Sequence, residues 1–442
     1  MREMKGSGIE WIGDIPADWE MRKIKQLADP NVENSFVDGD WIESPYIVDS
    51  GIRYLTTGNI GDGVFKEQGN GYITLKTFEE LACKYAFPGD LIISRLNAPY
   101  GRSCILPSNY AEYVVAVDNV ILRTQEDKRY ICYVSQCDGY KHTVEDDAKG
   151  TTMKRISRTN LGNIVMPLPP IQQQHRIADY LDRKCSQIDA IIARQQEVIE
   201  KLKAYKLSVI TEAVTKSLNP NVPMKDSGVE WIGEIPVHWT IGQLKHYASL
   251  RAGLTLGKKY PPNSKLVEVP YLRVANVQGD YVKLDDIADV SVLPEEIEKY
   301  SLHKNELLMT EGGDRDKLGR GCIWNGEIQP CLHQNHVFAV TTDTSKLRIE
   351  FLNYVTSSNV ARVYFDYTAK KTTNLASTNS TVILQFKLPI PPIKEQDSVV
   401  SYLETKCTEI DRCLSNTELI ISKLQNYKKS LIYEVVTGKK EV

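Results

Sequence analysis

The chain has 442 residues, of which 42% are hydrophobic and 25% are charged, and its formal net charge is −3. This size predicts roughly two to four globular domains with buried cores, and the weakly acidic balance excludes a uniformly basic, histone-like binder of nucleic acid. Contacts with a polyanion must therefore be confined to local patches. The first residues lack an apolar signal segment, and no apolar run approaches the roughly 18 residues of a membrane span. We expect a soluble, cytoplasmic protein whose nine scattered cysteines are reduced.

Two segments of the first half of the chain return in the second half. The pattern Trp-Ile-Gly-x-Ile-Pro-x-x-Trp occurs at residues 11–19 and again at 231–239, and residues 167–189 are echoed by residues 389–411. A duplication of such large units predicts two similar domains related by a pseudo-two-fold axis. Its tryptophans are the same in both copies, so we expect them to pack within the scaffold rather than to stack on bases that differ between two targets.

Each copy continues with short β-rich runs, such as residues 89–94 and 114–122, separated by Gly, Asn, Asp and Pro. These runs predict a compact α+β domain in each half. A Pro-rich turn ends each domain, because proline fixes φ and stops the preceding element. The predicted order is a domain over residues 1–168, a long helix over 169–216, a second domain over 217–390 and a second long helix over 391–438.

Apolar residues recur every seven positions along both predicted helices, which is typical of a coiled coil. We expect the two helices to pair antiparallel, so that the ends of the chain lie close together. The alternative is that each helix covers only its own domain, but a length of about 60 Å at 1.5 Å per residue favours the coiled coil. The predicted seam includes Leu181, Ile188, Leu202 and Tyr205 with Leu403, Ile410, Leu424 and Tyr427, and its second column also includes Ile177, Lys184, Ile191 and Val198 with Val399, Lys406, Cys413 and Ile420.

The paired Trp openings, the Pro-Leu/Ile-Pro-Pro-Ile turns and the repeated Tyr-Leu-x-x-Lys-Cys-x-x-Ile-Asp helices resemble the specificity subunits of type I restriction-modification systems, over essentially the whole chain. The resemblance implies two α/β target-recognition domains that each read one half of a split sequence in double-stranded DNA, and an antiparallel coiled coil that sets the gap between the halves. It also implies two bound methyltransferase (modification) subunits for N6-adenine methylation, and restriction (translocase and nuclease) subunits. The specificity subunit itself is expected to be non-catalytic and to hold no cofactor or metal, with S-adenosylmethionine, ATP and Mg on the partner subunits.

Three patterns could indicate chemistry on this chain. Asn97-Ala98-Pro99-Tyr100 is similar to the Asn-Pro-Pro-Tyr motif of adenine methyltransferases, but no glycine-rich turn for the cofactor precedes it, which favours a plain turn. Residues 251–259 imitate a phosphate-binding loop that is one residue short and lacks the metal-binding Ser or Thr. The last pattern, Cys322, Cys331, His333 and His336, does not have the spacing of a common zinc site. Two alternatives stay open: a self-contained adenine-N6 methyltransferase and a structural coiled-coil adaptor.

Reading DNA requires cationic, amide and hydroxyl side chains on exposed loops. Such residues gather at matching places in both halves, notably in a Thr-containing loop just before the last strand of each domain, which resembles the DNA-facing loop of the family. The alternative is that these are ordinary solvated loops, which also collect Lys, Thr and Asn. The candidate DNA-binding residues are Arg95, Asn97, Arg102, Thr151, Thr152, Lys154, Arg155 and Arg158 in the first half, and Arg315, Lys317, Arg320, Lys370, Lys371, Thr372, Thr373 and Asn374 in the second.

Overall fold

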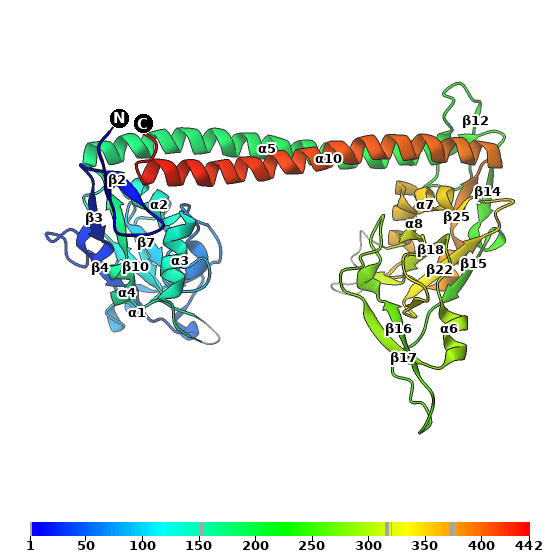
Figure 1. Cartoon of the computed structure of the whole chain (residues 1–442), viewed down its shortest axis with the longest axis horizontal. Helices are drawn as coiled ribbons and strands as arrows, with labels where there is room; N and C mark the ends of the chain where they lie inside the picture. The colour runs from blue at the N-terminus through cyan, green and yellow to red at the C-terminus, as the bar shows by residue number, and fades with distance from the viewer. Residues whose placement is uncertain (1, 151–153, 314–317, 320, 372–375) are drawn as a thin grey trace. The chain divides into compact units, whose positions relative to one another are not determined.

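The computed structural model describes residues 2–150, 154–313, 318–319, 321–371 and 376–442. The chain divides into two compact units. Unit 1 contains Met1–Gln195 together with Leu419–Val442, so both chain termini belong to it (Figure 1), and unit 2 contains Gln196–Glu418. Among the described residues, no helix is both long enough and apolar enough to cross a membrane.

Unit 1 is built on a four-stranded antiparallel sheet with the strand order β4-β10-β7-β8. All four residues of β7 and of β10 are buried, because both faces of the sheet are covered. A second sheet, β6-β5-β9, joins β5 and β9 in parallel, and two short antiparallel pairs, β1-β2 and β3-β11, complete the unit. The strands are β1 (Met4–Gly6), β2 (Asp14–Pro16), β3 (Glu20–Lys23), β4 (Phe36–Asp38), β5 (Ile52–Leu55), β6 (Tyr72–Ile73), β7 (Leu91–Ser94), β8 (Ser103–Ile105), β9 (Tyr113–Val115), β10 (Asn119–Leu122) and β11 (Val165–Leu168).

Short helices of unit 1 begin at polar caps that the sequence supplies. Asp127 accepts hydrogen bonds from the backbone N–H groups of the first turn of α2, and Ser157 does the same for α4. The short helices are α1 (Leu75–Glu80), α2 (Lys128–Ser135), α3 (Asp138–Asp146) and α4 (Arg158–Asn163).

Unit 2 repeats this architecture with strands from the second half of the chain. Its four-stranded sheet has the order β15-β22-β18-β20, and its second sheet, β17-β16-β21, again contains one parallel pair. The strands are β12 (Met224–Asp226), β13 (Glu234–Pro236), β14 (Thr240–Gln243), β15 (Ala248–Ala252), β16 (Val267–Leu272), β17 (Ala288–Val292), β18 (Glu306–Thr310), β19 (Gly312–Gly313), β20 (Gly321–Trp324), β21 (Leu332–His333), β22 (Val337–Thr342), β23 (Lys370–Lys371), β24 (Ala376–Ser377) and β25 (Lys387–Ile390). The short helices are α6 (Pro294–Tyr300), α7 (Ile349–Ser357), α8 (Asn359–Thr368) and α9 (Ser380–Gln385).

A glycine at one matching point shows how closely the two folds agree. A Cβ on Gly39 would lie 2.2 Å from the carbonyl oxygen of Val115, and a Cβ on Gly253 would lie 2.0 Å from that of His333. Only glycine fits where the backbone approaches a neighbouring strand this closely. The predicted duplication of an α+β domain is therefore confirmed by the two main sheets, which correspond in strand order and in their one parallel pair.

Two long helices, α5 (Ile171–Lys216) and α10 (Ile393–Val436), each contribute to both units. In unit 1 the ammonium of Lys428 donates to both carboxylate oxygens of Asp189 at 2.7 Å, so the start of α5 lies beside the end of α10. In unit 2 Lys206 donates to Asp411 at 2.7 and 2.8 Å, which places the end of α5 beside the start of α10. These matched ion pairs show that the helices pack antiparallel in each unit (Figure 1).

The register of the helical seam differs from the predicted one in its second column. Leu181, Ile188, Leu403 and Ile410 are buried as expected, but the side chains of Tyr205 and Tyr427 are more than half exposed. Ile177 and Val399, the first members of the predicted second column, are buried as expected. Further along both helices the buried column lies one residue later, at positions such as Cys185 and Ile199 in α5 and Cys407 and Val435 in α10. The α-helix has about 3.6 residues per turn, so a strict seven-residue column drifts away from the buried stripe and the following residue takes its place.

Each domain is attached to its own long helix through a tryptophan. The indole N–H of Trp19 donates to Gln173 at 2.9 Å in unit 1, and that of Trp239 donates to Glu395 at 2.9 Å in unit 2. Both indoles are almost fully buried, at 1% and 0% exposure. The expectation that these tryptophans pack within the scaffold is confirmed for this pair.

The next residue of each helix makes the same contacts in both units. Gln174 and Gln396 are fully buried, and their side-chain oxygens accept from the backbone N–H groups of Asp127 at 3.0 Å and of Arg348 at 2.8 Å. Their amide nitrogens donate to the carbonyls of Pro169 and Pro391 at 2.8 and 2.9 Å. These glutamines join the Pro-rich turn, the helix start and the domain.

Candidate nucleic-acid interface

The first candidate, Arg95, follows β7 and points into the domain rather than out of it. Its side chain is 4% exposed and its guanidinium donates to the carbonyls of Val117 at 2.6 Å and Ile156 at 3.0 Å. It also pairs with Asp38 at 3.0 Å. Burial lowers the pKa of Arg95 from its ordinary value, and the Asp38 carboxylate opposes that effect. The structure therefore corrects the expectation that Arg95 lies on an exposed loop.

Arg102 is also occupied, because it holds together the turn that contains the methyltransferase-like pattern. Its guanidinium donates to five backbone carbonyls, those of Thr57, Ile60, Leu96, Asn97 and Pro99. The side chain of Tyr100 is buried, and Asn97 has φ 62, a backbone conformation that asparagine tolerates better than most residues. Residues 97–100 thus form a turn, and Arg102 shapes it instead of standing free to meet a phosphate.

Exposed cations lie next to this turn. A bridge pairs Leu96 with Arg155, and a second pairs Arg155 with Lys149, which brings Lys149 and Arg155 against the turn. The exposed Arg155 pairs with Asp118 at 2.9 Å, and Arg158 lies 3.6 Å from Asp38. Lys154 is exposed as predicted, as is Asn97. The remaining unit 1 candidates, Thr151 and Thr152, lie outside the described residues.

Unit 2 presents the matching place on a small sheet with the order β19-β24-β23. Ser377 on the central strand is paired with both Gly312 and Lys370, as Arg155 is paired with Leu96 and Lys149 in unit 1. Lys370 is exposed, and Lys371 belongs to β23. The other unit 2 candidates lie outside the described residues: Arg315, Lys317, Arg320, Thr372, Thr373 and Asn374.

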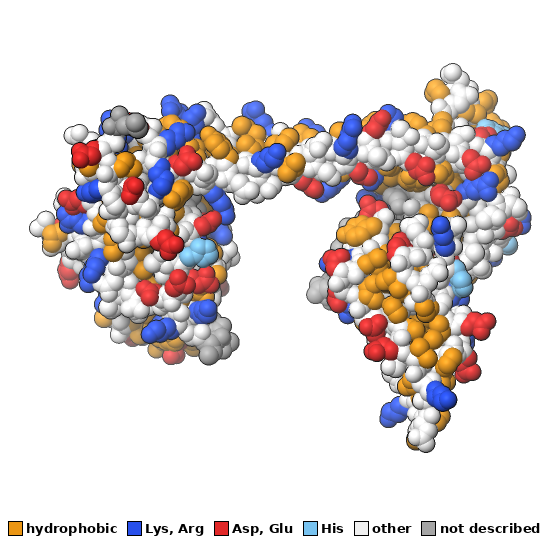
Figure 2. Space-filling model, viewed as in Figure 1, with side chains coloured by type: hydrophobic (Ala, Val, Ile, Leu, Met, Phe, Trp, Pro, Cys, Tyr) orange, Lys and Arg blue, Asp and Glu red, His pale blue; other side chains and the backbone are white. Residues whose placement is uncertain are grey.

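Three residues that the sequence did not single out as DNA contacts help to shape these surfaces. Asp38 and Asp118 hold the arginines of unit 1 in place through ion pairs. In unit 2 Glu311 forms a hydrogen bond with His336 beside β19. An alignment of the two halves through β7 and β18 would have placed Glu311 at the position of Arg95. No pattern in the sequence indicates the roles of Asp38 and Asp118. On the face that Figure 2 shows, acidic and basic side chains are interspersed over unit 1 rather than separated.

The patterns that imitate catalytic or metal sites have structural partners instead. Residues 251–259 resemble a phosphate-binding loop in sequence, but Arg251 lies on β15 and pairs with Glu306 at 2.8 Å, and Lys258 pairs with Glu296. His333 is buried, and its Nδ1 donates to the Val337 carbonyl at 2.7 Å. Among the described residues, no group of three His, Cys, Asp or Glu side chains is placed to hold a metal ion.

Comparison with known proteins gives one consistent result. Residues 16–201 match the family model described as the type I restriction modification DNA specificity domain. The StySPI specificity subunit of Salmonella potsdam is 22% identical over 317 residues, which cover 70% of this chain and 65% of that protein. The EcoBI specificity subunit of Escherichia coli is 22% identical over 80% of this chain and 74% of its own length.

Solved structures agree at the level of the fold. A chain from a study of complex assembly and conformational transition of the type I R-M system superposes with a TM-score of 0.71 at 14% identity, covering 96% of this chain and 99% of the other. The HsdS subunit from Thermoanaerobacter tengcongensis gives a TM-score of 0.51 at 12% identity, with 96% and 98% coverage. The fold, two α+β domains with two long helices, is that of type I specificity subunits. The first half of the chain therefore matches the DNA specificity domain of type I restriction-modification systems, and the chain as a whole is similar to type I specificity subunits.

Proposed function

We propose that this chain is the non-catalytic, DNA-binding specificity subunit of a type I restriction-modification complex, in which each unit reads one half of a bipartite target. The observation that carries the proposal is that one fold occurs twice and sets exposed Lys, Arg or Asn side chains at the same place each time. Lys149, Lys154, Arg155 and Asn97 supply them in unit 1, and Lys370 does so in unit 2. Cations there would neutralise phosphates, and amides would read base edges in the major groove.

The long helices would hold the partner subunits. Apolar side chains outside the buried seam remain 40–55% exposed on both helices, namely Ile191, Ile420 and Tyr427 in unit 1 and Val198 and Tyr205 in unit 2. Exposed apolar side chains repeated at seven-residue spacing on a helix favour a protein-binding face. Since each unit offers its own set, two methyltransferase subunits are expected, with S-adenosylmethionine, ATP and Mg bound by the methyltransferase and restriction subunits. Such a complex would act on DNA in the cytoplasm.

The test is the methylome of a restriction-minus host that expresses this chain with its methyltransferase gene. N6-methyladenine at one split, non-palindromic motif is the expected result, and it would also give both half-sites and their spacing. Methylation that persists without the methyltransferase gene would make this chain an enzyme. A purified complex that leaves the genome unmethylated would contradict the role in DNA recognition.

A further inference from the structure

The two units use one backbone arrangement at the end of the central strand pair. In unit 1 the N–H of Arg95 donates to the carbonyl of Asp118 at 2.8 Å, just after β7 and just before β10. In unit 2 the N–H of Glu311 donates to the carbonyl of His336 at 2.9 Å, just after β18 and just before β22. Glu311 therefore occupies the position of Arg95, and His336 that of Asp118.

The following segment docks in the same way in both units. The carbonyl of Arg95 accepts from the N–H of Ile156 at 3.1 Å, and that of Glu311 accepts from the N–H of Thr378 at 2.7 Å. The backbone hydrogen bonds of Arg95 and Glu311 are therefore equivalent through both the N–H and the carbonyl group, although the two side chains have opposite charge.

This change in side chain turns a buried group into a surface group. The side chain of Arg95 is 4% exposed and is neutralised by Asp38. Unit 2 has Ala252 in place of that aspartate, because Ala252 pairs with Phe338 as Asp38 pairs with Val120. The Glu311 side chain is 30% exposed, and its carboxylate is held by Nδ1 of His336.

The Glu311 carboxylate lies beside the surface of unit 2 that is proposed to meet DNA. Glu311 directly precedes β19. This strand belongs to the sheet β19-β24-β23, whose strand β23 carries the exposed Lys370. A carboxylate in a surface that meets DNA is repelled by phosphates, so it favours binding only where a base offers it a donor. In the major groove the donors are the exocyclic amino groups of cytosine and adenine.

We propose that Glu311 is a specificity-determining residue of unit 2, whose carboxylate accepts a hydrogen bond from the exocyclic amino group of a cytosine or an adenine. His336 is a positioning residue that fixes the carboxylate by donating to it from Nδ1. The proposal rests on the proposed function, because it requires that unit 2 reads one half of the target.

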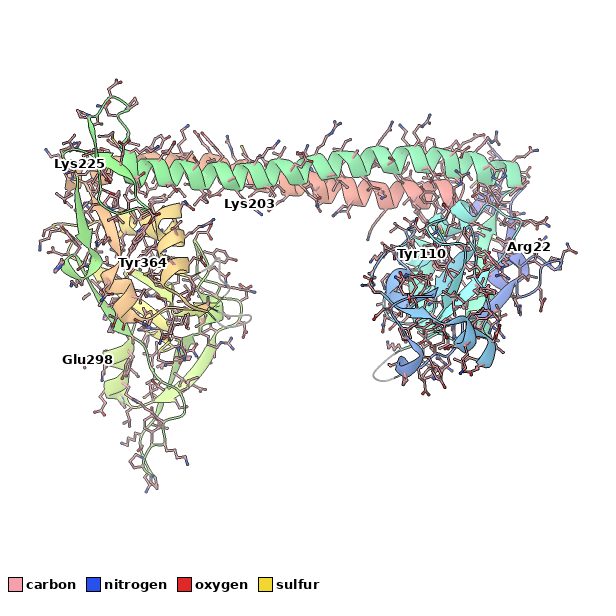
Figure 3. The ribbon with its side chains drawn as sticks, turned by 180° about the vertical axis from the view of Figure 1, so that it is seen from behind. Arg22, Tyr110, Lys203, Lys225, Glu298 and Tyr364 are labelled. Carbon is pink, nitrogen blue, oxygen red and sulfur yellow. The ribbon has the colours of Figure 1, made fainter. Side chains whose placement is uncertain are left out.

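The experiment compares the methylomes produced by the full complex with the wild-type chain, Glu311→Gln and His336→Ala. For Glu311→Gln we expect discrimination at a single base pair of one half-site to fall about ten- to a hundred-fold, while the other half-site is read unchanged. His336→Ala should relax the same base pair and no other. Glu298→Gln is the matched control, because Glu298 is an exposed carboxylate of unit 2 on α6 (Figure 3) and should leave the motif intact.

Two outcomes would overturn the proposal while leaving the proposed function intact. An unchanged motif in both variants would mean that the pair is only structural, and relaxation spread over both half-sites would mean that Glu311 supports folding rather than reading. If the Glu311→Gln complex fails to assemble, the His336→Ala complex still tests the proposal. This variant retains the carboxylate and must relax the same base pair. A wild-type methylome without a split motif would refute the proposed function itself, a failure that no variant is needed to detect.

Discussion

Arginine side chains of unit 1 serve the fold at two of the positions where DNA contacts were expected. Arg102 illustrates this, because its five acceptors are all neutral backbone carbonyls, the shortest bond being 2.6 Å to Ile60. The guanidinium is the side chain with enough donors to satisfy so many acceptors. Arg102 therefore fixes the shape of the turn through its hydrogen bonds.

Replacing Arg102 should therefore damage unit 1 before it affects DNA. We expect Arg102→Ala to lower the free energy of unfolding by about 3 kcal/mol, since three part-buried carbonyls and two exposed ones lose their donor. Urea denaturation of the full chain measures this loss. Arg102→Lys should recover only part of it, because an ammonium has three donors. Most of the loss should persist in high salt, because the hydrogen bonds go to neutral carbonyls and salt screens only the attraction between Arg102 and the Asp62 carboxylate; a loss that vanishes in high salt would contradict the assignment.

His333 gives unit 2 a pH-dependent contribution to stability that the equivalent position of unit 1 does not supply. The imidazole is fully buried, and desolvation lowers its pKa from 6.5 to about 4. Between those values the unfolded chain binds a proton that the folded chain does not. The contribution to stability is therefore complete above about pH 6.5 and falls as the pH decreases, by roughly 3 kcal/mol at pH 4.

The matched control for this prediction is His333→Val, because Val115 occupies the equivalent position in unit 1, where it pairs with Leu55 as His333 pairs with Leu272. The free energy of unfolding of both proteins would be measured from pH 8 to pH 4. We expect the two curves to converge as the pH falls. Parallel curves would show that His333 is protonated equally in the folded and unfolded states.

At the scale of elements, each helix start is matched to its own domain by a different polar pair. In unit 1 Asp127 accepts from Nδ1 of His175 at 2.7 Å. In unit 2 the carboxylate is on the helix instead, since Asp397 accepts from Arg348 at 2.7 Å. The shared glutamine contacts attach domain to helix, and these pairs make each attachment specific for its own unit.

A double-mutant cycle tests this matching. Arg348→Asp alone sets two carboxylates against each other, and Asp397→His alone sets an imidazole against a guanidinium. The double variant copies the Asp127–His175 arrangement of unit 1, so we expect its free energy of unfolding to be higher than the value obtained by adding the two single effects to that of the wild type. Any helix cap gained by Arg348→Asp is present in both backgrounds and cancels. Additive effects would show that the pairs do not interact.

The sequence predicted elements better than it predicted contacts. The repeated motifs were sufficient for the duplication, the long helices and strands such as β7 and β10, because periodicity and proline turns are local signals. They were not sufficient for the seam, where Tyr205 and Tyr427 were placed inside and lie exposed. Nor could they show that Arg95 is buried, because its partner Asp38 comes from a strand distant in the sequence. Ion pairs between remote segments leave no pattern in a single sequence.

At the scale of the whole molecule, a duplicated fold should bind DNA through duplicated phosphate contacts. Lys149 and Lys370 are exposed cations at equivalent positions. Each is paired with the segment that precedes the last short helix, Lys149 with Arg155 through an isolated bridge and Lys370 with Ser377 across the sheet β19-β24-β23. For each phosphate contact that is lost, the slope of log K against log salt should decrease in magnitude by about 0.9. We therefore expect Lys149→Ala and Lys370→Ala to reduce the slope equally, and the double variant to reduce it by about twice as much.

The measurement is the affinity of the complex of this chain with its methyltransferase subunits for a target duplex over a range of salt concentrations. An unrelated duplex of equal length should show the same reduction in slope, because phosphate contacts carry no sequence information. Lys203→Ala is the control, since Lys203 projects from α5 (Figure 3) and should leave the slope unchanged. If only one of the two variants changed the slope, the two units would approach DNA differently despite their common fold. In that case the divergent charges at Arg95 and Glu311 would reflect a difference in docking as well as in the bases that are read.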